Sequence, residues 1–441
     1  MKASFYTLGC KVNQYETQVL REQFAKAGYE ITGEDEVADI YVINTCSVTN
    51  LSDRKSRQKI RHLRRLNSDA VIVVTGCYAQ TAPEEVAEIE GVSVIAGANE
   101  KAHIVDFVEK YLKDRQESTH VLPYEELDTY IETGSITFME SRVRAFIKIQ
   151  EGCDRFCSYC IIPYARGKVR SRRLDDIVKE AKGLIESGCK EIVLTGINAA
   201  LYGKDFEDSP CGIDAVVAAI SRIEGDFRIR LSSLEPNVVD VAAAKKLTMF
   251  PKLCSHMHLS IQSGSDTVLK RMNRIYNTSE YEKIASVFKD QDPNYGLTTD
   301  IIVGFPGETE EEFKETLEAS KKIGFSKIHI FKYSVRNGTA AAHMPDQING
   351  SVKAERSEKL SILADELAHR FYEANAKTVR RVLFERVDEE TGMLTGYTDN
   401  YIKTYCKRED LHAEEPEGKF AYIKLEKPFK DGMTGIEVSM P

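Results

Sequence analysis

The stretch Cys153-Asp154-Arg155-Phe156-Cys157-Ser158-Tyr159-Cys160 places three cysteines within eight residues, in the spacing C-x₃-C-x₂-C. Three thiolates from one short loop can hold three irons of a four-iron cluster and leave the fourth iron open to another ligand. A zinc site needs a fourth cysteine or histidine nearby, and the nearest are His120 and Cys189. The alternative is three buried cysteines without a function, which their clustering in one polar loop disfavours. The spacing therefore predicts an iron–sulfur site with an open iron.

The cysteine loop follows the first of six short apolar segments that alternate with helical segments between residues 141 and 375. The predicted strands cover 143–149, 191–195, 228–232, 256–261, 298–303 and 327–331. Such runs between amphipathic helices are typical of parallel strands. We therefore expect a partial (β/α)6 TIM-like barrel, with a long helix over 351–376 leading out of it. Active sites of such barrels form at the C-terminal strand ends, where the cysteine loop lies.

Small and polar residues follow the next three strands of this predicted barrel. Thr195 and Gly196 end the second strand, Ser232 and Glu235 follow the third, and Gln262 follows the fourth. Each of them alone is ordinary turn chemistry. Together at one rim they predict a pocket that hydrogen-bonds ribose-like hydroxyls or an amino-acid head group.

Residues 1–115 also alternate between strands and helices. Strands are predicted over 4–8, 39–44, 70–75 and 92–95, and helices over 13–28 and 54–65. Strands connected through helices form parallel sheets that are covered on both faces. This region therefore predicts an N-terminal doubly wound parallel sheet.

Three cysteines of this first region share one position relative to the strands. Cys10, Cys46 and Cys77 each stand one to three residues past a strand's C-terminal end. The C-terminal ends of parallel strands share one edge of the sheet, where ligands bind. The repeated register predicts that the three cysteines converge and hold a second cluster with an open iron. The alternative is three buried thiols in separate turns.

The net charge of −9 argues weakly against a nucleic-acid partner, but two basic stretches stand out locally. Residues 54–65 carry seven Lys or Arg in twelve positions, and a helix places Ile60 and Leu63 opposite the arginines. Residues 166–173 form a second basic stretch beside the cysteine loop. A solvated helix face explains the first stretch alone, whereas the pair favours RNA. The residues predicted to bind RNA here are Arg54, Arg57, Arg61, Arg64, Arg166 and Arg170.

The remaining segments predict a linker and a C-terminal domain, and the cysteine content predicts the cellular compartment. Residues 116–140 lack periodicity and are interpreted as a linker. Residues 376–441 contain five short strands and predict a small all-β barrel, in which exposed aromatics beside Lys403 and Lys407 could contact RNA. This segment has 11 Lys or Arg against 13 Asp or Glu, so any RNA contact there must be local. Ten cysteines without a disulfide framework, and no apolar run of about 18 residues, predict a cytoplasmic protein without a membrane partner.

Several motifs together resemble the methylthiotransferases among the radical S-adenosylmethionine enzymes. The resemblance covers essentially the whole chain, including a C-terminal TRAM-like domain. It is strongest to the bacterial branch that acts on threonylcarbamoyladenosine in tRNA. The matching motifs, besides the cysteine loop, are Thr7-Leu8-Gly9-Cys10-Lys11-Val12-Asn13-Gln14-Tyr15-Glu16, Asn44-Thr45-Cys46, Thr75-Gly76-Cys77, Gln150-Glu151-Gly152-Cys153, Ile162-Pro163-Tyr164-Ala165-Arg166-Gly167 and Ile261-Gln262-Ser263-Gly264-Ser265.

The resemblance implies a role for each cysteine set. Cys153, Cys157 and Cys160 would hold the 4Fe-4S cluster that binds S-adenosylmethionine through its open iron. The cysteines at 10, 46 and 77 would hold an auxiliary 4Fe-4S cluster that carries the sulfur to be transferred. The residues implied to contact S-adenosylmethionine are Tyr159, Thr195, Gly196, Ser232, Glu235 and Gln262. The chain departs from the family at Asn198-Ala199-Ala200-Leu201-Tyr202-Gly203, where a glycine is more common in the middle, and in its non-basic C-terminal domain.

The family's scheme implies the reaction and the partners. One S-adenosylmethionine methylates a sulfur of the auxiliary cluster, and a second is cleaved to a radical that removes hydrogen from carbon 2 of the target adenine. The expected partners are a tRNA anticodon stem-loop, an external electron donor and a sulfur source. Alternatives are a methylthiotransferase for isopentenyl-adenosine in tRNA or for a ribosomal-protein aspartate. A non-catalytic iron–sulfur electron carrier or RNA-binding protein is more remote.

Overall fold

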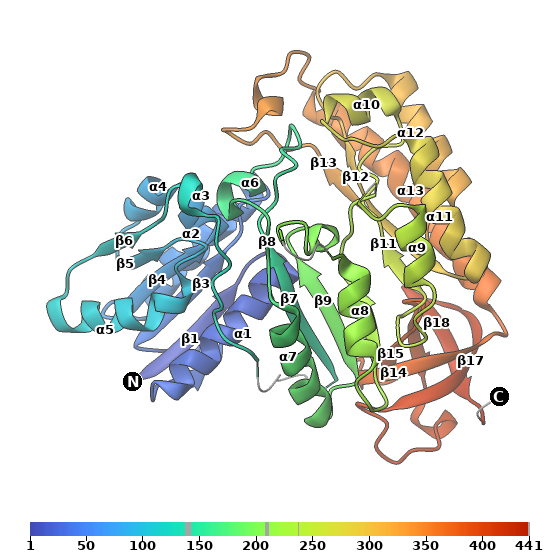
Figure 1. Cartoon of the computed structure of the whole chain (residues 1–441), viewed down its shortest axis with the longest axis horizontal. Helices are drawn as coiled ribbons and strands as arrows, with labels where there is room; N and C mark the ends of the chain where they lie inside the picture. The colour runs from blue at the N-terminus through green and yellow to red at the C-terminus, as the bar shows by residue number, and fades with distance from the viewer. Residues whose placement is uncertain (137–142, 208–210, 237, 440–441) are drawn as a thin grey trace.

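The computed structural model describes residues 1–136, 143–207, 211–236 and 238–439. Within these ranges the chain forms an N-terminal parallel sheet, a central region of parallel strands and helices, and a C-terminal β-barrel (Figure 1). The predicted α/β class is confirmed at this level. The predicted domain boundary at residues 140 and 141 lies outside the described residues. No helix in the described part is long and apolar enough to cross a bilayer.

The N-terminal sheet has six parallel strands in the order β2-β1-β3-β4-β5-β6. The sequence pattern does not predict β2 or β6, because three residues are too few to show a period. β6 lies inside the stretch interpreted as a linker, so the sheet extends further along the chain than expected. The strands are β1 Lys2–Thr7, β2 Glu30–Thr32, β3 Ile40–Thr45, β4 Val71–Gly76, β5 Val92–Ala96 and β6 Ser118–His120.

Helices cover both faces of this sheet, as its apolar strands require. In β4, Val71 and Val73 pack with one set of helices, whereas Ile72 and Val74 pack with the other, because successive side chains of a strand alternate between faces. The first set is α1 Lys11–Lys26 and α5 Ile104–Asp114, and the second is α2 Asn50–Leu66, α3 Cys77–Thr81 and α4 Pro83–Ala87.

The central region contains six parallel strands and one short antiparallel strand, β8, beside β7. The hydrogen-bonded order is β10-β9-β7-β8 in one sheet and β11-β12-β13 in another. Isolated bridges, Ile229 to Leu253 and Leu234 to Leu259, connect the two sheets where the predicted single ladder breaks. The strands are β7 Arg144–Glu151, β8 Arg170–Ser171, β9 Glu191–Gly196, β10 Arg228–Leu231, β11 His256–His258, β12 Gly296–Val303 and β13 Lys327–Lys332.

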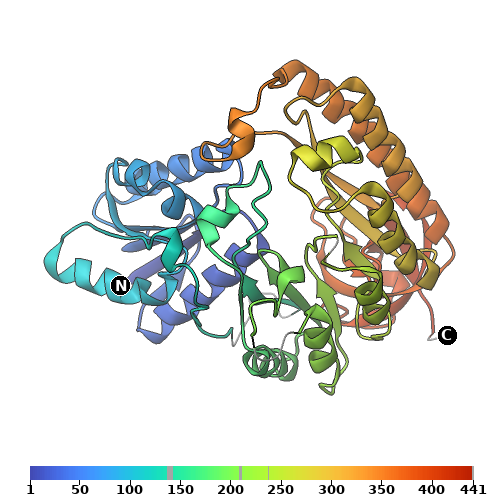
Figure 2. The same ribbon diagram turned by 45° about the horizontal axis from the view of Figure 1, so that its top comes forward.

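Helices pack along the outer side of these strands (Figures 1 and 2). Their ends follow from local chemistry. In α12, for example, Thr309 and Glu312 form a capping box at the start and Gly324 takes the left-handed conformation at the end. The helices on the outer side are α7 Leu174–Glu186, α8 Ile213–Ser221, α9 Val241–Leu247, α10 Asp266–Arg271, α11 Thr278–Gln291, α12 Glu310–Ile323 and α13 Gly350–Asn375. The short helix α6 Ile162–Arg166 packs instead against α3 of the N-terminal region.

Helix α1 of the N-terminal region packs against the central strands beside β7 (Figure 1). Its Tyr15 and Val19 belong to the same buried apolar core as Ile147 and Ile149 of β7. The hydroxyl of Tyr15 donates to Glu180 of α7 at 3.2 Å. The first two regions therefore share a core, and the loops at the C-terminal ends of both sets of strands are brought near one another.

The C-terminal region forms a closed five-stranded barrel in the order β14-β15-β16-β18-β17, as the sequence predicts. It contacts the starts of β7, β9 and β10, at the opposite strand ends from the cysteine loop (Figure 1). Glu191, at the start of β9, accepts from Arg228 and Arg230, and these arginines also donate to backbone carbonyls of the barrel. The strands are β14 Val379–Val387, β15 Leu394–Thr398, β16 Lys403–Cys406, β17 Phe420–Phe429 and β18 Gly432–Glu437.

Candidate functional site

Cys10, Cys46 and Cys77, here the N-terminal trio, follow the three adjacent strands β1, β3 and β4. Asn13 ties two of the turns together, because its Nδ2 donates to Leu8 O at 2.6 Å and to Thr45 O at 3.0 Å. The turn before Cys10 needs glycine. Gly9 has a φ of +104°, and a Cβ there would lie 2.7 Å from Cys46 Cβ. The structure thus brings the three predicted cysteines to one sheet edge.

Burial and mutual repulsion both act on these thiols. Cys46 is buried, and burial together with the negative charge of a Cys77 thiolate raises its pKa to about 11. Desolvation also raises the pKa of Cys10, although this residue is exposed at the surface. A metal centre supplies the positive charge that such thiols need in order to stay deprotonated.

Cys153, Cys157 and Cys160, here the loop trio, lie in the turn after β7. The turn is fixed from several sides: Cys153 N donates to Gly167 O at 3.0 Å, Cys160 N donates to Cys157 O at 2.9 Å, and Ser158 N donates to Met272 O at 3.0 Å. Burial raises the pKa of Cys153 to about 11 and of Cys160 to about 12, with the Cys157 thiolate charge adding to both. The backbone hydrogen bonds therefore hold the loop trio in one fixed turn after β7.

Both trios fit a cluster that leaves one iron without a protein ligand. Each offers three sulfur donors, and in each an arginine N–H is directed at one sulfur: Arg166 Nε lies 3.2 Å from Cys77 Sγ, and Arg274 Nη1 lies 3.2 Å from Cys157 Sγ. Hydrogen bonds to cluster sulfurs are a known determinant of reduction potential. Among the described residues, no three Cys, His, Asp or Glu side chains are placed to hold a single metal ion.

Arg166 is fully buried, which corrects its prediction as an RNA contact. Besides Cys77, its Nη1 donates to Glu16 Oε1 at 2.7 Å and its Nη2 donates to Asn13 Oδ1 at 2.6 Å. Nη1 also reaches Glu151 Oε1 at 3.2 Å. One guanidinium thus connects α1 and the N-terminal trio to the end of β7, where the cysteine loop begins.

Two buried lysines complete this group, here called the junction network: Glu16, Lys101, Lys148, Glu151 and Arg166. Glu16 Oε2 lies 3.1 Å from Lys101 Nζ, and Lys148 Nζ lies 3.2 Å from Glu16 and 3.0 Å from Glu151. Burial alone would raise the pKa of Glu16, but the three cations hold it well below its usual value. Three cations face two carboxylates, which leaves one positive charge beside Cys77.

Arg170 is also buried, and the prediction that it binds RNA is corrected in the same way. Its Nη1 donates to Asn99 Oδ1 at 2.9 Å and its Nη2 donates to Arg166 O at 2.5 Å. Neighbouring Arg172 pairs with Glu132 at 2.7 Å and with buried Glu180. The second basic stretch is therefore mainly internal, because its buried arginines bond to carboxylate, amide and carbonyl oxygens of the folded chain.

The other predicted RNA contacts have mixed surroundings. On α2, Arg54 and Arg61 are exposed, Arg57 and Arg64 are half-buried, and the opposite face is buried as predicted. Lys403 lies 3.2 Å from Asp431, so its charge is paired.

The aromatic residues near Lys403 are not the exposed set expected from the sequence. Tyr405 is buried, and the ring of Tyr401 lies 4.5 Å from the guanidinium of Arg230 in the central region. This expectation is corrected, because Tyr405 packs inside the barrel and Tyr401 contacts the central strands.

The predicted contacts of S-adenosylmethionine gather at the strand ends near the loop trio. Thr195 and Ser232 are buried, and the Ser232 hydroxyl has no hydrogen-bond partner among the described residues. Gln262 has a φ of +66°, which is a strained backbone conformation for a residue other than glycine. Strain of this kind is concentrated at functional sites. The ring of Tyr159 packs edge-on against Phe305. Gly196 lies against Gln150.

Glu235 is the centre of a charged group that the sequence pattern does not reveal. Its carboxylate accepts from Asn198 Nδ2 at 2.6 Å, from Arg155 Nε at 3.2 Å and from Arg274 Nη1 at 3.2 Å. Arg274 also donates to the sulfur of Cys157, so this charged group is in direct contact with the loop trio. Arg274 lies in no motif or periodic segment, so only the fold identifies it.

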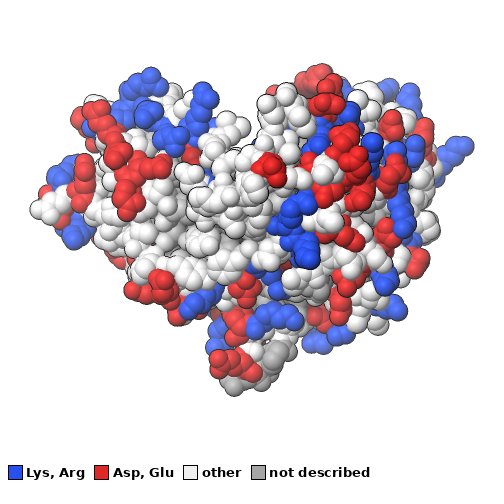
Figure 3. Space-filling view, turned by 90° about the horizontal axis from the view of Figure 1, so that it is seen from above, with Lys and Arg blue, Asp and Glu red and all other residues white. Residues whose placement is uncertain are grey.

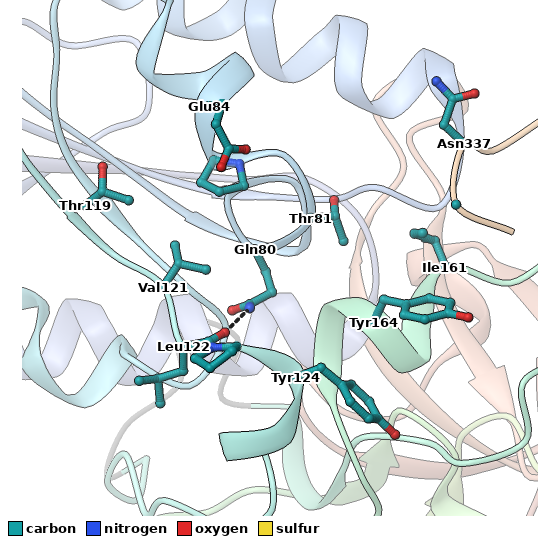
Figure 4. A pocket seen from close by; sticks show the side chains of 13 residues that line it. Gln80, Thr81, Glu84, Thr119, Val121, Leu122, Tyr124, Ile161, Tyr164 and Asn337 are labelled. Carbon is teal, nitrogen blue, oxygen red and sulfur yellow. Dashed lines mark hydrogen bonds between the residues drawn. The ribbon is translucent and has the colours of Figure 1, made fainter.

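A cavity of about 800 Å³ lies between the N-terminal and central regions (Figure 4). Its wall includes Gln80 and Thr81 of α3, which begins at Cys77, and Ile161 and Tyr164, which follow Cys160. Residues 119 and 121–124 and the loop with Asn337 complete it. A single hollow is thus lined by segments that lead directly from each trio.

Comparisons with known proteins agree with this arrangement. The model of the Uncharacterized protein family UPF0004 matches residues 2–97, and that of the Radical SAM superfamily matches residues 147–319. The threonylcarbamoyladenosine tRNA methylthiotransferase MtaB of Bacillus subtilis is 42% identical over 97% of this chain and 95% of its own. A tRNA-2-methylthio-N(6)-dimethylallyladenosine synthase of Alkaliphilus oremlandii is 36% identical over 86% of this chain and 81% of its own.

Among solved structures, the radical S-adenosylmethionine methyltransferase TsrM of Kitasatospora setae has a similar fold. Its TM-score is 0.58, with 15% identity and 77% of each chain covered. At this identity the likeness concerns the fold alone. The sequence relatives, matched over almost their full lengths, establish the family: the chain belongs to the radical S-adenosylmethionine methylthiotransferases of the MtaB type.

Proposed function

We propose that this protein transfers a methylthio group to carbon 2 of N6-threonylcarbamoyladenosine at position 37 of tRNA, forming ms2t6A with two 4Fe-4S clusters and S-adenosylmethionine. The observation that carries the proposal is the pair of cysteine trios, one on each side of the junction network, with residues that follow Cys77 and Cys160 lining one cavity. When bound, the cofactors supply the abstraction of hydrogen at carbon 2 and the methylthio group that replaces it.

The protein's own part is to hold, orient and shield. The loop trio and the N-terminal trio are the proposed cluster ligands. Ser232 and its neighbours at the strand ends are the proposed contacts of S-adenosylmethionine, since the unpartnered buried hydroxyl requires a ligand or a water to satisfy it. The shared core of α1 and β7 keeps the two trios at a fixed separation, which suits a reaction with two reacting centres.

The relatives support the threonylcarbamoyladenosine branch over the dimethylallyladenosine branch. Identity to the named MtaB relative is 42%, against 36% for the named synthase. We further propose a cytoplasmic enzyme with a small TRAM-like RNA-binding barrel at its C-terminal end, served by an external electron donor and a sulfur source.

The decisive experiment expresses the chain in a bacterium that lacks its own tRNA methylthiotransferases. Mass spectrometry of tRNA nucleosides should show ms2t6A in cells that express the wild type. Cells that express the Cys46→Ser variant should contain only t6A, without the methylthio group. Appearance of the 2-methylthio form of isopentenyl-adenosine instead would transfer the protein to the other branch. A methylthiolated aspartate in a ribosomal protein from the same cells would instead assign the protein to the methylthiotransferases that act on ribosomal proteins.

A non-catalytic role is tested separately on the purified protein. Reduced, anaerobically reconstituted protein should cleave S-adenosylmethionine, and a pure electron carrier should not. Iron and sulfide counting should give about eight irons per chain for two four-iron clusters.

A further inference from the structure

Three aromatic rings from separate segments meet at the edge of the cavity. Tyr124 begins the short helix after β6, Phe156 lies within the cysteine loop, and Tyr164 lies in α6. The ring centroids are 5.7 Å apart for Phe156 and Tyr164, 6.2 Å for Tyr124 and Phe156, and 6.4 Å for Tyr124 and Tyr164. The three rings are called the aromatic platform below.

The platform is presented to solvent rather than packed into the core. Phe156 is 39% exposed and Tyr164 is 45% exposed, although both belong to segments that are otherwise fixed. Phe156 has a φ of +46°, which is a strained conformation for an aromatic residue. Asn273 Nδ2 donates to Phe156 O at 3.0 Å and so holds this conformation. Strain maintained by a specific partner points to a use for the exposed ring.

The cavity next to the platform offers polar groups that have no partner in the protein. Among the described residues, the hydroxyls of Tyr124 and Tyr164 and the amide of Asn337 make no hydrogen bond. Figure 4 shows the Tyr124 and Tyr164 rings as neighbours, with Asn337 beyond Ile161 on the same side of the cavity. Seen from above, the middle of the molecule has few charged side chains (Figure 3), and among the residues that line the cavity Glu84 is the charged one.

We propose that the aromatic platform stacks an unpaired base of the tRNA loop beside the cysteine loop. This inference rests on the proposed function and names the protein surface that receives the RNA. A flat ring with hydrogen-bonding edges matches exposed aromatic faces with free hydroxyl and amide groups at their edge. Phosphate groups would need cations, and the centre of this face has few. The base is therefore held by stacking, and the phosphates are left to basic residues elsewhere.

The test uses full-length holoenzyme with measured iron content and an anticodon stem-loop RNA. The RNA carries 2-aminopurine either at the target position or at one of its two neighbours, because stacking on an aromatic ring quenches this probe. We expect one position to be quenched on binding, and that position identifies the stacked base. Phe156→Leu, Tyr164→Ala and Tyr124→Leu should each weaken binding about tenfold and restore the fluorescence.

Two controls separate stacking from general damage. Tyr164→Phe keeps the ring and should keep the quenching. Met249→Ala removes an apolar side chain that is 76% exposed after α9, away from the cysteine loop, and should bind as wild type. The slope of affinity against salt should stay constant across the ring variants, because stacking releases no counterions.

The outcomes distinguish the two levels of the proposal. If the wild type binds these RNAs, and methylthiolates a stem-loop that carries N6-threonylcarbamoyladenosine, but the three ring variants match it in affinity and quenching, the platform is wrong and the proposed function stands. If the wild type binds no stem-loop at all, both are wrong. Tyr124 lies outside the cysteine loop, so its variant remains informative even where Phe156→Leu lowers the iron content.

Discussion

Replacing Arg166 by Met removes the charge that joins the two cysteine trios. The Met side chain is unbranched and apolar, so the change removes the charge and every hydrogen bond of the guanidinium. Its partners, Glu16 and Glu151, are 1% and 5% exposed and cannot recover their hydration. Arg166→Met should therefore destabilise the contact between α1 and β7 specifically.

The size of the effect follows from what remains around the carboxylates. Removing one member of a buried ion pair costs about 3–5 kcal/mol. Glu16 keeps Lys101 at 3.1 Å and Lys148 at 3.2 Å, so the cost should lie at the lower end. A loss of about 3 kcal/mol lowers the protection of backbone amides about 100-fold wherever exchange requires opening of this contact.

Segment-resolved hydrogen exchange on the anaerobic holoenzyme measures this loss, since a chain of several regions does not unfold in one two-state step. Reduced protection should be confined to α1, β7 and α6. The surface variant Arg65→Met on α2 should stay within about 0.5 kcal/mol of the wild type. Equal protection in Arg166→Met and the wild type would refute the reasoning.

The pH dependence provides a second check. The cations hold the pKa of Glu16 and of Glu151 below the usual value despite their burial. A carboxylate with a lowered pKa in the folded state stabilises that state above its unfolded pKa of about 4.3, and this contribution is lost as the pH falls further. The difference between wild type and Arg166→Met should therefore be full at neutral pH and shrink below about pH 4. A difference that grows on acidification would contradict the assignment.

Three further predictions concern the candidate sites. Cys46→Ser and Cys157→Ser should each lower the iron content from about eight to about four per chain, and a loss of all iron in either would argue against independent clusters. Arg54→Glu with Arg61→Glu should weaken tRNA binding and reduce its salt dependence while the iron content stays constant, and unchanged affinity at low salt would remove α2 from the interface. Arg274→Met removes an N–H from Cys157 and should shift the potential of the loop-trio cluster to more negative values in an EPR-monitored titration; an unchanged potential would count against that contact.

The sequence predicts the parts of the site that depend on strand register. Cys10, Cys46 and Cys77 could be placed together because parallel strands end at one edge, and the strands were long enough to show their period. β6 could not be predicted, since three residues carry no period. The bridge between β10 and β11 that replaces a regular ladder was equally hidden, because it depends on how the two sheets curve.

The basic residues show the opposite case. An arginine looks the same in the sequence whether it faces RNA or a buried carboxylate, and only the fold decides between them. Arg166 lies 150 positions from Glu16 in the sequence and 2.7 Å from it in space. On α2, by contrast, local periodicity was enough, because Ile60 and Leu63 mark the buried face within the same helix.

The position of the C-terminal barrel constrains how the proposed RNA partner can lie. Arg228 and Arg230 hold it at the starts of the central strands, by donating to Tyr397 O at 3.0 Å and to Asp399 O at 3.2 Å. Both trios lie at the other strand ends. A nucleotide that contacts the barrel is therefore remote in space from the base at the cavity. Substitutions on the barrel surface should change how tightly the RNA binds without changing which base is modified, whereas changes at the aromatic platform act where the base itself is held.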